Sequence, residues 1–209
     1  FLISMNFSIL PSFNFFKRTK VTPTKVKETS QLVEPLRNDF TSTKDLFTYA
    51  RKRCVDAINS DKPYEHTVLV DTKKNKVMAE FIGDANHCNL DGLEKMQLDK
   101  DNTILLHGHP VGTPISSADV STILNTPVTQ VIAFDKDGKF SLVAKKIDKK
   151  PNVSKEFNNF RLEQYDLADE MADNGQFELY NKATDYVLKK HAPLMGLRYL
   201  SNYAYALKK

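Results

Sequence analysis

The chain has 209 residues, of which 41% are hydrophobic and 27% are charged. This composition suits one domain with a buried core and excludes a disordered chain. The net charge of +4 is too small to indicate a nucleic-acid-binding protein by itself. Two cysteines, Cys54 and Cys88, exclude a disulfide framework and suit a reducing compartment, so we expect a cytoplasmic protein. No apolar run reaches the roughly 18 residues that a membrane-spanning helix needs, so no membrane partner is expected.

The N-terminal segment differs in composition from the rest of the chain. Residues 1–16 are rich in phenylalanine, and the basic residues of 17–27 follow them without an acidic residue. A secretory signal has its positive charge before the apolar stretch, which is the opposite order. Pro11 and Pro23 interrupt any long helix. We therefore expect an extended arm over 1–40 that packs its aromatic side chains on a neighbouring surface or docks into an assembly partner.

From residue 41 onwards the sequence alternates between helical and extended patterns. Ser42 or Thr43 can cap the first helix, since both side chains accept hydrogen bonds from backbone N–H groups. The predicted elements are, in order, a helix up to Ile58, a hairpin of strands 65–70 and 77–82, a short helix within 91–98, a buried strand at 103–106, a helix at 116–125, and strands at 129–134 and 139–144. This order predicts an α/β domain over 41–150, with a central mixed sheet flanked by helices.

The last sixty residues have a helical pattern, with breaks near Asn174 and at Pro193. We therefore expect a helical C-terminal extension over 151–209. Aromatic residues recur in it at helical spacing, which is typical of core or oligomer contacts. The alternative is a surface that docks a substrate or an assembly partner.

One group of residues predicts chemistry. His107-Gly108-His109-Pro110 follows the predicted strand 103–106, and Asp119 lies at the start of the next helix. Histidines at i and i+2, where a strand passes into a loop, can direct both imidazoles to one point. Two imidazoles and a carboxylate, with a water in the fourth position, form a ligand set suited to a catalytic zinc ion. We therefore expect Zn²⁺ to be bound by His107, His109 and Asp119.

The stretch from His107 to Asp119 resembles the His-x-His-(x)7-Ser-x-x-Asp motif of the JAMM/MPN (JAB) metalloproteases. Six residues separate His109 from Ser116, one fewer than in that motif. Counting to Ser117 restores seven but brings Asp119 one residue early. The resemblance covers roughly residues 60–145 and implies a JAB/MPN-like metalloprotease domain. It also implies that Ser116 hydrogen-bonds the oxyanion that develops on a substrate carbonyl.

The family also requires an upstream glutamate as general base. Glu65 opens the stretch Glu-His-Thr-Val-Leu-Val-Asp, which is similar to the Glu-His-x-x-x-Leu-x-Leu-Asp stretch of RadC-like members. Glu80, in the second strand of the hairpin, is the alternative base; otherwise it is expected to be an exposed strand residue. We prefer Glu65 because both its flanking sequence and its place in the strand order match.

Four further residues could hold a metal but are assigned other roles. His66 follows Glu65 directly, so its side chain is expected on the opposite face of the strand and away from the zinc. His87 and Cys88 are expected to be loop residues, since no matching pair lies nearby in the sequence. His191 is expected near a helix end, where a cation suits the helix dipole.

Together these residues predict a zinc-dependent hydrolase that cleaves a peptide or isopeptide bond of a protein or peptide substrate. A zinc-activated water would attack the bond, and the glutamate would act as general base. One alternative is a non-enzymatic assembly subunit, such as a virion component, that retains the JAB fold. The other is a RadC-like DNA-associated protein, which only the mild positive charge favours, so a nucleic-acid partner is not expected.

Overall fold

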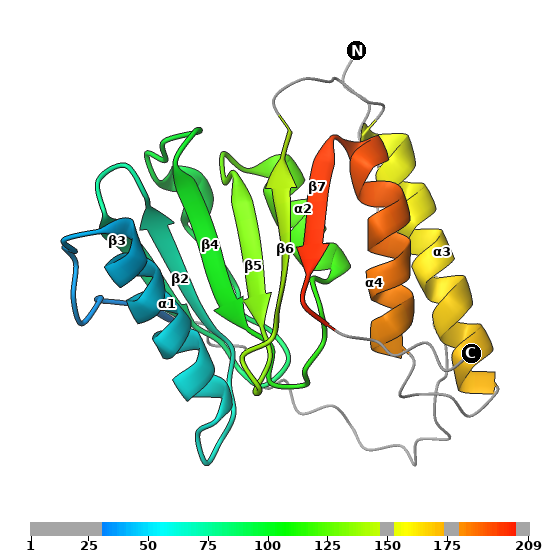
Figure 1. Cartoon of the computed structure of the whole chain (residues 1–209), viewed down its shortest axis with the longest axis horizontal. Coiled ribbons are helices and arrows are strands. Elements are labelled where there is room, and N and C mark those ends of the chain that lie inside the picture. The colour runs from blue at the N-terminus through cyan, green and yellow to red at the C-terminus, as the bar shows by residue number, and fades with distance from the viewer. Residues whose placement is uncertain (1–30, 147–152, 174–179, 204–209) are drawn as a thin grey trace.

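A computed structural model gives the fold and describes residues 31–146, 153–173 and 180–203. The phenylalanine-rich stretch 1–16 and the basic stretch 17–27 lie outside these residues. Within the described chain, seven strands form one mixed sheet in the order β1-β3-β2-β4-β5-β6-β7 (Figure 1). The strands are β1 (Gln31–Val33), β2 (His66–Asp71), β3 (Lys76–Ile82), β4 (Thr103–Gly108), β5 (Gln130–Phe134), β6 (Phe140–Lys145) and β7 (Leu197–Ser201).

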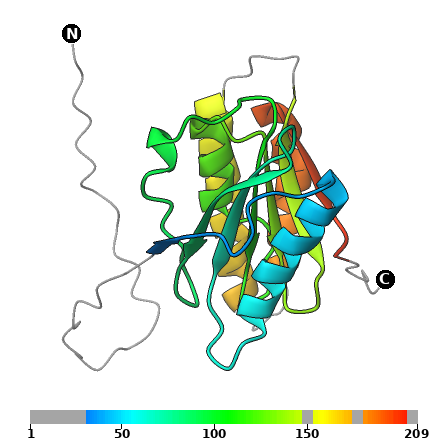
Figure 2. The ribbon, with the colours of Figure 1, turned by 90° about the vertical axis from the view of Figure 1, so that its left-hand side faces the viewer.

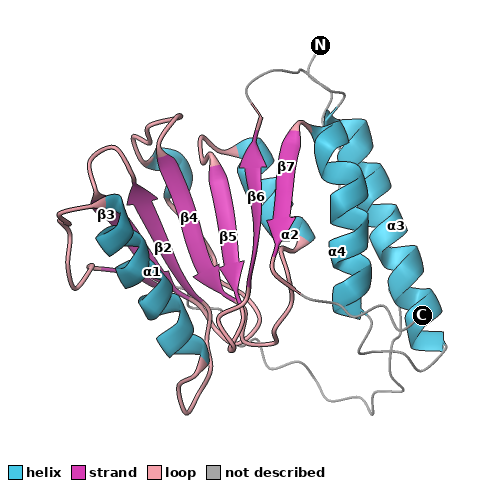
Figure 3. Ribbon diagram, viewed as in Figure 1, coloured by secondary structure: helices cyan, strands magenta, loops and turns pink. Residues whose placement is uncertain are grey.

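Among the described residues four α-helices flank this sheet, and Figure 3 shows them in cyan around the magenta strands. They are α1 (Thr43–Ile58), α2 (Ser117–Asn125), α3 (Val153–Asp173) and α4 (Tyr180–His191). Figure 2 shows α1 on one face of the sheet and α2 on the other. The pair α3–α4 packs in the same core layer as α2, next to β7 (Figure 1). The predicted α/β class, with a central mixed sheet flanked by helices, is confirmed.

Strand alternation divides the core into two apolar layers. Leu69, Leu105 and Val131 pack in the layer that contains α2, α3 and α4. Val68 and Leu106 pack in the layer below α1. Successive side chains of a strand point to opposite faces, so each buried strand contributes to both layers.

The β4–β5 pair sets the position of the functional site. β4 and β5 are parallel, whereas the other strand pairs of the described sheet are antiparallel. A parallel pair needs a crossover connection, and α2 supplies it. The N-terminus of α2 therefore lies close to the carboxyl end of β4.

Most of the predicted elements are confirmed within one or two residues. Ser42 caps α1 by accepting a hydrogen bond of 3.1 Å from the Asp45 N–H. The predicted hairpin corresponds to β2 and β3. The short helix predicted within 91–98 forms as a single 3₁₀ turn at Leu93–Lys95. Met96 follows it with an extended backbone, φ −78° and ψ 140°, so the turn does not continue as an α-helix.

Both ends of the sheet extend beyond the predicted domain boundaries. Residues 31–33 were assigned to the extended arm, but they pair with β3 as β1. Residues 197–201 were assigned to a helical extension, but they pair with β6 as β7. Tyr199 on β7 is buried, as expected for a core aromatic, whereas Tyr165 and Tyr186 are more than half exposed. No helix of the described residues has the length and apolar character to cross a membrane.

Candidate metal centre

His107 and His109 lie where β4 ends. His107 pairs with Thr67 of β2 and with Ala133 of β5, so its backbone is fixed from both sides. The His109 N–H donates a hydrogen bond of 2.8 Å to the Phe134 carbonyl, which extends the β4–β5 pairing by one step. The two side chains therefore project from the same face of the sheet, as predicted from their i, i+2 spacing.

Asp119 approaches them from the first turn of α2. The Ser116 hydroxyl accepts a hydrogen bond of 3.2 Å from the Asp119 N–H. The Asp119 carboxylate in turn accepts one of 2.7 Å from the Ser116 N–H. This reciprocal pair is a capping box, a local motif that starts a helix and satisfies its first N–H groups. It also directs the carboxylate back toward the end of β4.

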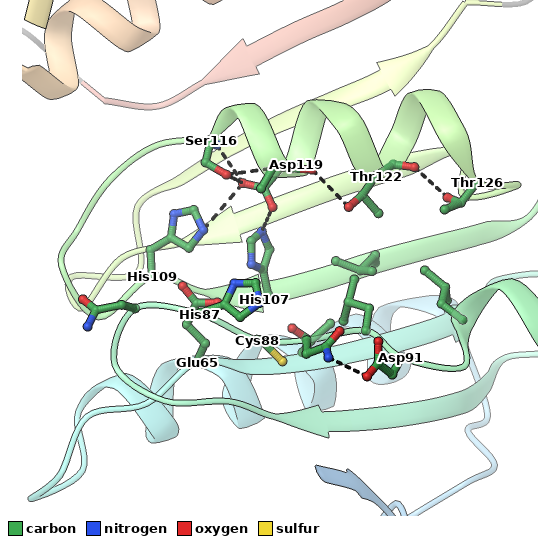
Figure 4. A pocket seen from close by; sticks show the side chains of 17 residues that line it. Glu65, His87, Cys88, Asp91, His107, His109, Ser116, Asp119, Thr122 and Thr126 are labelled. Carbon is green, nitrogen blue, oxygen red and sulfur yellow. Dashed lines mark hydrogen bonds and ion pairs between the residues drawn. The ribbon is translucent and has the colours of Figure 1, made fainter. Parts of the chain in front are cut away.

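The three side chains converge on one point, as Figure 4 shows. The Nε2 atom of His107 lies 3.2 Å from Oδ1 of Asp119, and the Nε2 atom of His109 lies 3.6 Å from Oδ2. One ligand atom from each residue lies within 4.8 Å of the others, and all three residues are buried. Two imidazoles and a carboxylate at this spacing could hold a metal ion.

The hydrogen bonds around the cluster leave ligand atoms directed inward. The Nδ1–H of His109 donates a hydrogen bond of 2.8 Å to the Thr113 carbonyl, which leaves Nε2 as the atom with a lone pair. The Nε2 atom of His107 is buried and makes no hydrogen bond with any described residue. Buried polar atoms are rarely left without a partner, so a metal ion at this point would satisfy it.

The protonation states also suit a metal. Burial lowers the pKa of His107 to about 4, so its imidazole is neutral at neutral pH. Burial alone would raise the pKa of Asp119. The adjacent side chains of His107 and His109 and the hydrogen bonds from Ser116 outweigh this effect and hold that pKa below its usual value. A neutral imidazole, as in His107, and an ionised carboxylate, as in Asp119, are the forms that bind metals.

The cluster opens into a cavity of about 350 Å³ between α2 and the loop that follows β3. Glu65, which directly precedes β2, lines this cavity together with the three predicted ligands. Burial raises the pKa of Glu65 to about 7. A carboxyl group with such a pKa can both accept and release a proton near neutral pH.

Ser116 also lines the cavity, but its hydroxyl is already engaged. Its Oγ–H donates a hydrogen bond of 2.7 Å to Oδ2 of Asp119. In this structure Ser116 therefore orients a predicted metal ligand. The predicted contact with a substrate oxyanion would require the hydroxyl to rotate away from Asp119.

Glu80, the alternative base, lies on the other face of the sheet below α1. It is fully buried, so the expectation of an exposed strand residue is wrong. Its carboxylate accepts hydrogen bonds from Tyr49 at 2.6 Å and from Arg53 at 3.0 Å, and it contacts Nε2 of His66 at 2.6 Å. His66 therefore points away from the metal cluster, as predicted. Arg53 and Tyr49 belong to α1, so this network attaches α1 to the sheet.

Two cavity residues were not assigned to the site by the sequence analysis. His87 and Cys88 belong to a loop, as expected, but both line the cavity. Burial raises the pKa of Cys88 to about 11, so its thiol stays protonated. The pairing of β2 with β3 brings this loop next to Glu65. The polar stretch at 84–89, directly after a strand of the hairpin, was the signal that could have indicated it.

His191 makes a separate polar contact that does not include the three predicted metal ligands. It ends α4 and lies between two glutamates of α3, with Nδ1 at 2.5 Å from Glu156 and Nε2 at 2.7 Å from Glu163. Its position at a helix end agrees with the prediction. The two carboxylates contact opposite nitrogens of the ring, so they hold α3 and α4 together.

Comparisons with protein-family models, with curated proteins and with solved structures give no match to this chain. The candidate site therefore depends on its own geometry, and the structure places all five predicted site residues, Glu65, His107, His109, Ser116 and Asp119, around one cavity.

Proposed function

We propose that this protein is a zinc-dependent hydrolase that cleaves a peptide or isopeptide bond. The observation that carries the proposal is the convergence of His107, His109 and Asp119 beside Glu65 in a single cavity. Two imidazoles and a carboxylate form a ligand set that zinc uses in catalytic sites. A ligand set of three also leaves a position for water, as in catalytic rather than structural zinc sites.

The resemblance to JAMM/MPN metalloproteases supports the same function. In that family the glutamate, the two histidines, the serine and the aspartate act together, and here they come together in space. We propose that the mixed sheet with α1 and α2 on its two faces is a JAB/MPN-like domain. The family's proteolytic chemistry is the most direct use of these five residues.

The residues of the chain have separate tasks in such a reaction. A bound Zn²⁺ would lower the pKa of a water molecule and polarise the substrate carbonyl. Glu65, with its pKa near 7, takes the proton of the attacking water and delivers it to the leaving amine. Ser116 holds the carboxylate of Asp119 in place through its N–H and its hydroxyl.

The test is metal content by mass spectrometry, together with hydrolysis of peptide and isopeptide substrates. We expect about one zinc per chain in the parent protein and loss of zinc in His109→Ala and Asp119→Ala. Glu65→Gln should keep its zinc but lose at least about 100-fold in kcat, since a general base contributes 10²–10⁴. Glu80→Gln is the matched control, because this carboxylate lies on the opposite face.

Two results would contradict the proposal. A parent protein without zinc, even after reconstitution, would rule out the hydrolase and favour a structural module. Full zinc content with activity lost in Glu80→Gln and retained in Glu65→Gln would show that the base is wrongly assigned.

A further inference from the structure

The loop after β3 carries a histidine for which the proposed reaction has no task. His87 lines the cavity from the wall opposite α2 and is itself exposed, so a ligand in the cavity can reach it (Figure 4). Glu65, the proposed base, lines the same cavity.

A compact turn fixes the position of His87. The carboxylate of Asp84 accepts hydrogen bonds from the N–H groups of Asn86, at 2.7 Å, and His87, at 2.9 Å. The N–H of Asp84 donates a hydrogen bond of 2.9 Å to the His87 carbonyl. Three hydrogen bonds within four residues hold the backbone that carries the imidazole.

The same turn is attached directly to Glu65. The Glu65 N–H donates a hydrogen bond of 2.7 Å to the Asp84 carbonyl, and the Gly83 N–H donates one of 2.9 Å to the Glu65 carbonyl. The turn also packs closely, since a Cβ atom at Gly83 would lie 2.1 Å from the His87 carbonyl oxygen. The backbones of Glu65 and His87 therefore have a fixed relative position.

The proposed reaction needs a hydrogen-bond donor that the α2 wall does not supply. When water adds to a carbonyl, the carbonyl oxygen becomes an anion, and a preorganised donor stabilises it. The hydroxyl of Ser116 donates to Asp119, that of Thr122 to the Ala118 carbonyl, and that of Thr126 to the Thr122 carbonyl. On the facing wall, His87 presents a ring N–H whether its imidazole is neutral or charged.

We infer that His87 is a catalytic residue whose ring N–H donates a hydrogen bond to the developing oxyanion; this inference rests on the proposed function. The water oxygen bonds to the carbonyl carbon, Glu65 takes the proton, and the carbonyl electron pair moves to the oxygen that His87 contacts. The pair then returns and the C–N bond breaks. The nitrogen leaves as an amine with the proton from Glu65, and the other product is a carboxylic acid.

The experiment compares His87→Ala, His87→Gln and Ala85→Ser with the zinc-loaded parent. Removal of one oxyanion donor costs about 10²–10³ in kcat. We expect a loss of this size in His87→Ala, with KM changed less than about threefold, and partial rescue in His87→Gln, whose amide retains an N–H donor. Ala85→Ser changes an exposed residue of the same turn that does not line the cavity, and it should keep kcat within about threefold of the parent.

A second measurement does not depend on turnover. A phosphinic peptide carries a tetrahedral anionic group in place of the scissile bond, and its Kd can be measured by calorimetry. The His87→Ala substitution should weaken this Kd by at least about tenfold, as expected for a lost hydrogen bond to a charged group. The Kd of the uncleaved peptide, measured in the Glu65→Gln background with and without His87→Ala, should change little.

The outcomes separate this inference from the proposed function. An active parent with unchanged kcat in His87→Ala overturns the role of His87 alone. Equal losses of affinity for the phosphinic peptide and the uncleaved peptide would also overturn it, since His87 would then be a binding residue. A parent that binds no zinc and cleaves no peptide overturns the hydrolase and the role of His87 together.

Discussion

Glu65 directly precedes β2 and Glu80 lies on the neighbouring strand β3, and the pleat of the sheet separates them. Glu80 pairs with Val68, and both side chains lie in the layer below α1. Glu65 shares its face with Thr67, which lines the cavity with it. Directly paired residues of antiparallel strands lie on the same face. The pairing register therefore places the Glu65 carboxylate, and not that of Glu80, on the face of the predicted metal ligands.

The raised pKa of Glu65 has a consequence for stability. Burial raises this pKa from 4.5 to about 7, so the folded protein binds more protons than the unfolded chain between these values. Stability is therefore lost as the pH rises from about 4.5 through 7. We expect Glu65→Gln to remove this loss and to stabilise the metal-free protein by on the order of 2 kcal/mol at pH 8, after allowance for partial exposure.

Urea unfolding in the presence of a chelator checks this prediction at pH 8 and pH 4.5. The stabilisation should be absent at pH 4.5, where the Glu65 carboxyl is protonated in the folded state. Glu34→Gln, an exposed position, serves as the control and should show no such pH dependence. A difference between parent and Glu65→Gln that stays constant with pH would contradict the expected pKa.

At the scale of the elements, Gly108 links the packing of α1 against β4 to the position of the predicted histidine ligands. It lies between the two predicted histidine ligands and faces α1. A Cβ atom at this position would lie 2.8 Å from Cγ2 of Ile58 and 2.9 Å from the carbonyl oxygen of Cys54. Both distances are shorter than real contacts allow, so the close approach of β4 to α1 requires glycine here.

Gly108→Ala is therefore expected to displace α1 or the end of β4. We predict a loss of about 1–3 kcal/mol in the free energy of unfolding, as for other overpacked cores, together with reduced zinc occupancy. Gly138→Ala is the matched control. Gly138 has a φ of 73°, so alanine there should cost about 1 kcal/mol but leave the zinc content unchanged. The free energy of unfolding and the zinc content of both variants, compared with those of the parent, test this prediction.

The elements with strong local patterns were the ones that sequence reasoning identified. The cap at Ser42, the polar turn between β2 and β3, and the apolar run before His107 each depend on neighbouring residues. β1 and β7 are short edge strands, and each depends on a partner strand distant in sequence. β7 alternates buried and exposed residues, but its sequence does not alternate in polarity, because Leu200 is apolar and more than half exposed.

The residues of the candidate site also differ in how far local sequence patterns predict them. His107, His109 and Asp119 were predictable because they occupy one local stretch with a recognisable spacing. For His87 the polar stretch at 84–89 indicates only a loop after the hairpin, since its place in the cavity follows from the β2–β3 pairing and from the turn at Asp84. The burial of Glu80 depends on two side chains of α1, Tyr49 and Arg53, which no strand pattern could indicate.

At the scale of the whole molecule, the C-terminal helices share one core with the sheet. Phe160 of α3 and Leu188 of α4 are fully buried in the same apolar cluster as Leu105 and Val131 of the sheet. β7 then returns the chain to the sheet edge. The described protein should therefore unfold as one cooperative unit.

The Phe160→Ala substitution tests whether the C-terminal helices and the sheet unfold together. Removal of a fully buried phenylalanine is expected to cost about 3–5 kcal/mol, and the loss should appear in a single transition. Far-UV circular dichroism and tyrosine fluorescence should follow coincident curves in urea. Leu162→Ala, at a position that is 61% exposed on the same helix, should change stability by no more than about 0.5 kcal/mol. Two separate transitions, with only one of them shifted, would contradict a shared core.

The short distance along the chain between the predicted ligands affects the order of assembly. His107 and Asp119 are twelve residues apart, whereas Glu65 precedes His107 by 42 residues. Closure of a short loop costs less entropy than closure of a long one, so the proposed zinc ion would already be chelated through these residues in an incompletely folded chain. Binding to the unfolded state reduces the stabilisation that a ligand confers on the native state. Zinc would therefore guide folding around His107 more than it would raise the melting temperature.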